Sequence, residues 1–204
     1  MKQFVVTGTD TGIGKTVFAA ALTQALNAIY WKPVQAGLDG ETDSQIVARL
    51  SGRPVLPETY RFKLPASPHQ AAAAEGVALD PSHLSLPQIT APLVVEGAGG
   101  LLVPLNDDTL FIDVFARWQV PLILCASTRL GTINHTLLSL EAIHAHKIPL
   151  LGIAFLGVAT DESTRIIGTF GKAKKLGRLE LVSPLTSGNL ASAFAAGFDA
   201  KDFA

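Results

Sequence analysis

The segment that decides the fold reads Gly8-Thr9-Asp10-Thr11-Gly12-Ile13-Gly14-Lys15-Thr16. It follows an apolar run at residues 4–7, which is typical of a buried strand, and it opens a helical pattern over residues 15–27. A glycine-rich turn between a strand and a helix lets backbone N–H groups surround phosphate oxygens. The spacing from Gly8 to Gly14 is one residue longer than in the common phosphate loop. The plainer alternative is a strand-to-helix turn with a chance Gly-Lys-Thr.

Outward from this loop, apolar runs alternate with helical patterns. Near-continuous apolar runs, which suit strands covered on both faces, occupy residues 4–7, 93–96, 121–126 and 150–156, with less clear candidates at 29–34 and 179–182. Helical patterns occupy residues 15–27, 43–50, 68–75, 110–118 and 134–146. The alternation predicts an α/β fold, in which a mostly parallel central sheet is flanked by helices in three layers. We expect a single P-loop nucleotide-binding domain over residues 1–204, with a loosely ordered alanine-rich tail from residue 191.

Composition narrows the class of protein. The 204 residues include 16 Lys and Arg against 17 Asp and Glu, so the formal net charge is -1. Binding to nucleic acid or to an anionic membrane therefore has no electrostatic support, and we expect neither partner. The most apolar stretch, residues 148–159, is too short to span a membrane, and the first residues carry no secretory signal. The single cysteine, Cys125, is expected to be a buried core thiol in a cytoplasmic protein.

The residues of the loop point to a nucleoside triphosphate with Mg²⁺. Lys15 can reach the β- and γ-phosphates, and the Thr16 hydroxyl can bind the metal. Mg²⁺ also needs one or two carboxylates. Glu96 ends an apolar strand, where a buried carboxylate is costly without a cation. Asp43 is a second candidate ligand, or simply a helix cap. Lys32 is either a charge aimed into the cleft or a solvated lysine at a strand end.

Four segments taken together resemble the dethiobiotin synthetase family over roughly residues 1–152. They read GTDTGIGKT from residue 8, KPVQAG from 32, VEGAGG from 95 and LGTINH from 130. The resemblance implies a cyclo-ligase of biotin biosynthesis. It would form the cyclic urea of dethiobiotin from 7,8-diaminononanoate, CO₂ and ATP, through carbamate and carbamic-phosphate intermediates.

The resemblance also implies a role for each matching residue. Nucleotide binding would fall to Gly12, Ile13, Gly14, Lys15, Thr16, Val17, Asp43, Glu96, Gly97, Ala98 and Gly99. Three of these, Thr16, Asp43 and Glu96, would hold Mg²⁺, which makes Asp43 a ligand rather than a cap. The catalytic groups would be Lys32, Lys15 and Thr11. In a homodimer, Thr132, Ile133 and Asn134 would receive the distal carboxylate of the substrate bound to the partner subunit.

Three departures from the family pattern stand in this sequence. Ala36 replaces a common Ser or Thr beside the substrate. Leu156 replaces an Asn that reads the adenine edge, and residues 177–180 lack a family proline near the base. Since a leucine side chain cannot form hydrogen bonds, we expect relaxed base selectivity, with other nucleoside triphosphates accepted. The alternatives are a P-loop ATPase of the partition or cobyrinate-amidation type and a binding protein with a relic loop. Asp10 counts against the partition type, because those ATPases usually carry a lysine there.

Overall fold

The computed structural model describes residues 2–203 and places seven strands in one sheet, in the order β4-β2-β6-β1-β7-β8-β9. Every neighbouring pair in this sheet is parallel. The strands are β1 (Gln3–Gly8), β2 (Ile29–Trp31), β4 (Val55–Leu56), β6 (Leu93–Glu96), β7 (Leu122–Ser127), β8 (Leu150–Leu156) and β9 (Lys175–Leu179). A separate parallel pair joins β3 (Val34–Ala36) to β5 (Tyr60–Phe62). The predicted α/β fold with a parallel central sheet is confirmed.

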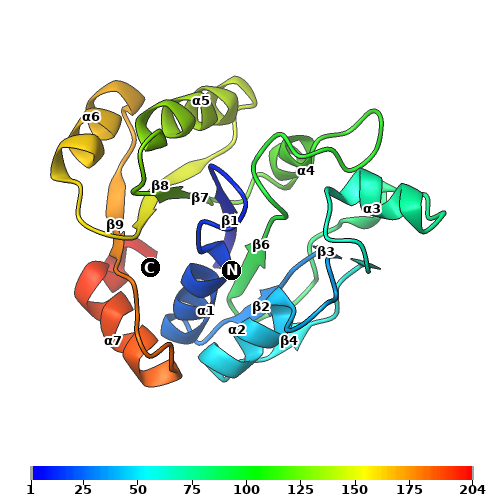
Figure 1. Cartoon of the computed structure of the whole chain (residues 1–204), viewed down its shortest axis with the longest axis horizontal. Helices are drawn as coiled ribbons and strands as arrows, with labels where there is room; N and C mark the ends of the chain where they lie inside the picture. Colours follow the sequence, from blue (N-terminus) through cyan, green and yellow to red (C-terminus); the bar gives the residue numbers. More distant parts are fainter. Residues whose placement is uncertain (1, 204) are drawn as a thin grey trace.

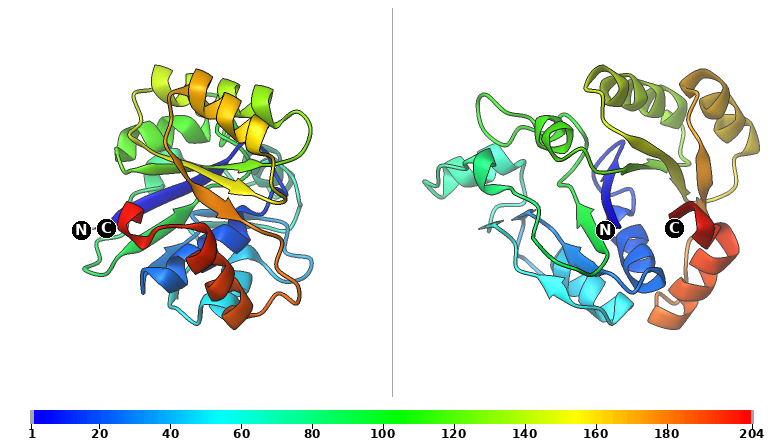
Figure 2. Two further views of the ribbon diagram at one scale, coloured as in Figure 1. Left: turned by 90° about the vertical axis from the view of Figure 1, so that its left-hand side faces the viewer. Right: turned by 180° about the vertical axis from the view of Figure 1, so that it is seen from behind.

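Helices cover both faces of the sheet, as Figures 1 and 2 show. One face carries α1 (Lys15–Ala25), α2 (Asp43–Ser51) and α7 (Ser187–Gly197), and the other carries α4 (Phe111–Trp118), α5 (Thr132–Ala145) and α6 (Asp161–Gly171). The remaining helices are α3 (Pro68–Ala74) and the short 3₁₀ turns Pro81–His83 and Ala200–Phe203. Side chains alternate between the two cores along β1, with Val5 in one and Phe4 and Val6 in the other. Within residues 2–203, no helix has the length and apolar character to cross a membrane.

The expected strand at residues 29–34 is divided in two. β2 ends at Trp31 in the main sheet, and β3 begins at Val34 in the small one. Pro33 lies between them and has no N–H to donate to a neighbouring strand. Its carbonyl instead accepts from the N–H groups of Thr59 and Tyr60. The break leaves Lys32 at the carboxyl end of β2, where ligands of parallel sheets bind.

The expected strand at residues 179–182 is misplaced, because β9 spans Lys175–Leu179. The apolar residues that suggested it, Leu181 and Val182, leave the sheet and line a cavity instead. β9 pairs with β8 through its backbone, with Gly177 opposite Ala154, so pairing rather than an apolar run defines it. The helix α6 was also missed, because its Ser, Thr and Gly residues lower helix propensity.

The expectation of a loosely ordered tail is wrong. Residues 187–197 form α7, and the aromatic rings of Phe194, Phe198 and Phe203 are buried. The Phe198 ring lies 5.4 Å from that of Phe18 on α1, and Phe203 packs edge-on against Phe4 of β1 at 6.2 Å. Weak helical patterning hid these contacts, since the rings are widely spaced along the tail and all point to one core.

Candidate active site

The phosphate loop runs from the end of β1 to the start of α1. Gly14 precedes α1 with a φ of 103°, a left-handed conformation that favours glycine, and no side chain caps the helix. The first N–H groups of α1 are therefore available to an anion. Thr9 N–H donates to the carbonyl of Cys125 at 3.0 Å, which anchors the loop to β7. Lys15 crosses the loop, and its Nζ donates to the carbonyl of Asp10 at 2.6 Å.

Four polar side chains from separate elements meet beside this loop. The Thr16 hydroxyl on α1 lies 3.0 Å from Asp43 Oδ1 and 2.9 Å from Glu96 Oε1. Lys32 Nζ lies 2.6 Å from Asp43 Oδ2 and 3.4 Å from Glu96 Oε1. The register explains part of this meeting, since β2 and β6 pair up to Trp31 opposite Val95. The next residues, Lys32 and Glu96, therefore lie side by side.

The simpler interpretations of Asp43 and Lys32 do not hold. Thr42 caps α2, in a capping box with Gln45, and Asp43 is free to face Thr16 and Lys32 instead. Lys32 is only 4% exposed, so it is not a solvated lysine at a strand end. Glu96 is 1% exposed and is not a surface acid. The structure thus brings together the charged residues that the sequence placed around one cleft.

The charges of this cluster change one another's pKa values. At Lys15, burial lowers the pKa below its ordinary value, although Glu96 acts in the opposite direction. At Lys32, burial acts to lower the pKa, but Glu96 and Asp43 together outweigh it and the pKa is raised. At Asp43, burial acts upward, but Lys32 holds the pKa below its ordinary value. Lys32 and Asp43 are thus a charged pair at neutral pH.

The oxygen atoms of the cluster fit a Mg²⁺ ion. Asp43 Oδ1 and Glu96 Oε1 both lie within hydrogen-bond distance of Thr16 Oγ1, and three hard oxygen ligands of this kind suit the metal. Within residues 2–203, no group of three or more His, Cys, Asp or Glu side chains could hold a metal by itself. A metal here would therefore need the hydroxyl and phosphate oxygens as well as the two carboxylates.

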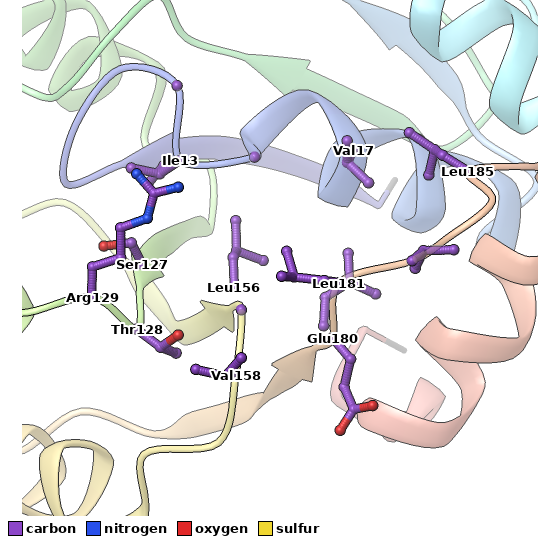
Figure 3. Close-up of a pocket in the computed structure, with 15 residues that line it drawn as sticks. Ile13, Val17, Ser127, Thr128, Arg129, Leu156, Val158, Glu180, Leu181 and Leu185 are labelled. Atoms are coloured by element: carbon purple, nitrogen blue, oxygen red, sulfur yellow. The ribbon is translucent and has the colours of Figure 1, made fainter.

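Two cavities flank the loop. The first, of about 400 Å³, is lined by residues 12–14 and by mostly apolar side chains, among them Leu156 at the end of β8 and Leu181 (Figure 3). Polar groups of Ser127, Thr128 and Arg129 stand on one side, and the Glu180 carboxylate points away (Figure 3). The second cavity, of about 390 Å³, lies on the Thr11 side of the loop. Its lining includes Thr11, Lys32, Gln35, Ala36, Asp43, Ser67 and Gly99.

Two further residues, for which the sequence predicts no role, also contact the cluster. The Tyr30 hydroxyl donates to Glu96 Oε2 at 2.8 Å. Gln35 Oε1 accepts from the backbone N–H of Asp43 at 3.3 Å. Tyr30 lies two residues before Lys32, and this spacing places both side chains on one face of an extended segment. This spacing is the one feature of the sequence that links Tyr30 to the site. Its hydrogen bond to Glu96 is seen only in the tertiary structure.

The segment at the start of α5 lies outside both cavities. The Thr132 hydroxyl is buried and donates to the carbonyl of Ser127, whereas Asn134 is exposed. Beside the segment, Leu130 is fully exposed, and Leu102 and Leu138 remain 56% and 61% exposed. Leu102, Leu138 and His135 line a shallow hollow of about 230 Å³. Within this subunit the segment therefore completes neither cavity.

Comparison with solved structures supports the fold alone. A ParA family ATPase from Chlorobium tepidum TLS matches with a TM-score of 0.54 and 12% identity, covering 94% of this chain and 88% of that one. The MinC:MinD cell division complex of Aquifex aeolicus matches with a TM-score of 0.54 and 11% identity, covering 95% of this chain and 86% of the matched chain. The chain thus shares the fold of these proteins.

Comparison of sequences is much more specific. A family model described as an AAA domain matches residues 2–189. An ATP-dependent dethiobiotin synthetase BioD of Rhodopseudomonas palustris (strain HaA2) is 60% identical, over 99% of this chain and 96% of its own length. The protein of the same name from Agrobacterium fabrum (strain C58) is 58% identical, over 98% of this chain and 96% of its own length. With identity of this level over nearly the whole length, and a phosphate loop beside two carboxylates and a buried lysine, the chain belongs to the ATP-dependent dethiobiotin synthetase family.

Proposed function

We propose that this chain is an ATP-dependent dethiobiotin synthase of biotin biosynthesis, which closes the cyclic urea of dethiobiotin from 7,8-diaminononanoate, CO₂ and ATP. The observation that carries the proposal is the position of Lys32. Its ammonium group lines the second cavity and contacts Asp43 and Glu96 beside the phosphate loop. A diamine in this cavity would therefore lie next to the γ-phosphate of a nucleotide held by the loop.

The residues suit a reaction that transfers a phosphoryl group to a carbamate. One amine of the substrate attacks CO₂ and forms a carbamate, whose oxygen then attacks the γ-phosphorus and displaces ADP. The second amine attacks the carbamic-phosphate carbon, and phosphate leaves as the ring closes. Lys15 and Lys32 approach the transferred group from two sides and stabilise its charge, and Thr11 orients the reacting nitrogen. Such a transfer needs mainly positioning and charge neutralisation.

The nucleotide would bind with Mg²⁺. Its phosphates would lie along residues 12–17, close to Gly97, Ala98 and Gly99, and its base would enter the first cavity. Thr16, Asp43 and Glu96 would hold the metal, which neutralises charge on the β- and γ-phosphate oxygens when bound. The side chains around the base would be mostly apolar, and Leu156 offers the base no hydrogen bond. Base selectivity should therefore be relaxed.

The active site would be completed by a second copy of the chain. Exposed leucines, Leu102, Leu130 and Leu138, surround the start of α5 and are suited to burial between subunits. In such a homodimer, Thr132, Ile133 and Asn134 would offer a helix N-terminus to the distal carboxylate of the partner's substrate. We expect this dimer to act in the cytoplasm, where the free thiol of Cys125 stays reduced.

The direct test incubates the protein with 7,8-diaminononanoate, bicarbonate, Mg²⁺ and ATP. We expect a product heavier than the diamine by one carbonyl group minus two hydrogens, formed together with ADP and phosphate. Lys32→Ala should largely abolish this product, whereas Lys63→Ala, a change at an exposed lysine outside both cavities, should not. ATP hydrolysis that ignores the diamine and yields no new product would contradict the proposal.

A further inference from the structure

The Tyr30 hydroxyl is a polar group in an apolar layer. The side chain is fully buried, in the core that also contains Phe18, Leu22 and Val94. A phenylalanine would fill this space without carrying a polar atom away from water, and a buried hydroxyl is costly unless it is hydrogen-bonded. Its hydrogen bond goes to Glu96 Oε2 at 2.8 Å. The packing of β2 does not need the hydroxyl oxygen of Tyr30. The hydroxyl group is therefore explained by its hydrogen bond to the Glu96 carboxylate.

The contacts of Glu96 divide between its two oxygens. Oε2 accepts from Tyr30 on the core side. Oε1 faces the loop, where it accepts from Thr16 at 2.9 Å and from Lys32 at 3.4 Å. With one oxygen held on the core side, the carboxylate cannot turn without losing a buried hydrogen bond. Tyr30 therefore fixes the orientation of the Glu96 carboxylate, with one oxygen directed at the phosphate loop.

We propose that Tyr30 is a positioning residue for metal binding, which acts by holding Glu96 so that Oε1 points at the Mg²⁺ position beside Thr16. The inference rests on the proposed Mg²⁺ site of Thr16, Asp43 and Glu96. Residues that hydrogen-bond to a metal-binding carboxylate orient it, and their loss typically weakens metal binding or activity by about 10- to 100-fold. Tyr30 lines neither of the two cavities beside the loop, so its loss should act through the metal.

The test compares Tyr30→Phe with Tyr60→Phe, the same chemical change at the other tyrosine of the chain. Tyr60 bonds to Asp80 and His83 near the surface, away from the phosphate loop. Electron paramagnetic resonance measures the Kd of Mn²⁺ on each variant in the presence of a non-hydrolysable ATP analogue. Thermal unfolding without metal reports the stability of each variant separately.

We expect the Mn²⁺ Kd to rise about tenfold or more in Tyr30→Phe and to stay within about twofold of wild type in Tyr60→Phe. In a Glu96→Gln background, Tyr30→Phe should add little further weakening, because its effect passes through Glu96. A Tyr30→Phe protein that loses only stability, with an unchanged Mn²⁺ Kd, would overturn the role of Tyr30. Wild-type protein that binds no Mn²⁺ with the analogue would instead overturn the metal site itself.

A second measurement applies even if Tyr30→Phe does not fold. Tyr60→Phe leaves Tyr30 as the sole tyrosine, so 3-fluorotyrosine labelling of that variant gives a single ¹⁹F resonance from Tyr30. Adding Mg²⁺ to protein already saturated with the ATP analogue in EDTA should shift this resonance. The reason is that the metal would bind the Glu96 carboxylate, which accepts the hydrogen bond of Tyr30. A resonance that does not respond to Mg²⁺ contradicts the proposal.

Discussion

At the scale of single residues, Lys32 links the two carboxylates of the site. It is the cation between Asp43 and Glu96, and it contacts both carboxylates. Removing it leaves these carboxylates, which are buried or half-buried, without the cation that contacts them directly. We therefore expect Lys32→Ala to lower the free energy of unfolding by about 3 kcal/mol at pH 7 in metal-free buffer. Chemical denaturation in EDTA measures this loss.

The loss should depend on pH with a definite sign. In the wild type the pKa of Asp43 is lowered by Lys32, so its contribution is present above its ordinary pKa and disappears as pH falls through the lowered value. In Lys32→Ala the burial of Asp43, which acts to raise its pKa, is no longer opposed by Lys32, so the folded variant gains stability as pH falls. The difference from wild type should therefore shrink from pH 7 toward pH 4. A difference that is constant over this range contradicts the electrostatic account.

Leu156 is the second residue with a testable role. It lies in the first cavity, where its side chain offers no hydrogen bond to a base (Figure 3). We expect turnover with CTP and GTP to fall within about a hundredfold of turnover with ATP, or about 2.7 kcal/mol. Leu156→Asn should increase the preference for ATP. Steady-state kinetics with the three nucleotides decide this point, and a stronger wild-type preference for ATP contradicts it.

At the scale of elements, α7 and the following turn complete one core rather than extend from it. Phe194 is 4% exposed, and its ring lies 6.1 Å from that of Phe18 on α1, the helix that begins in the phosphate loop. We expect Phe194→Ala to cost about 3 kcal/mol of unfolding free energy through the cavity it leaves. Phe170→Ala, at a ring 69% exposed on α6, is the matched control and should change little. Equal effects in urea denaturation would show that α7 is not part of the core.

At the scale of the whole molecule, the proposed dimer predicts that subunits share active sites. Asn134→Asp adds a negative charge in the first turn of α5, which favours the helix but repels a substrate carboxylate. We expect it to raise the KM for the diamine without loss of stability. Mixed with Lys32→Ala under conditions of subunit exchange, and assayed with the diamine far below the raised KM, it should restore about a quarter of the wild-type activity, since half of the dimers then carry one intact site. No recovery on mixing would mean that each subunit uses its own segment.

The parts of the fold that the sequence predicted well depend on neighbours along the chain. The phosphate loop, α1, β6 and β8 were placed within a few residues, because glycine spacing and apolar runs are local signals. The sequence misplaces β9, because backbone pairing to β8 defines this strand. It does not predict α7, because the packing of three widely spaced phenylalanines stabilises this part of the chain. In the site, the sequence singled out Lys32, Asp43 and Glu96. The sequence does not indicate a role for Tyr30, because its hydrogen-bond partner Glu96 is 66 residues away along the chain.

The sequence by itself therefore determined the chemistry available to this protein: a phosphate-binding turn, two lysines and two carboxylates at the ends of its elements. Only the tertiary structure decided how those groups are used. Parallel pairing of β2 with β6 sets Lys32 beside Glu96, and packing of α1 and α2 on that face brings Thr16 and Asp43 to the same point. The reason is physical: burial and charge pairing depend on distances between distant segments, and these exist only after the sheet has formed.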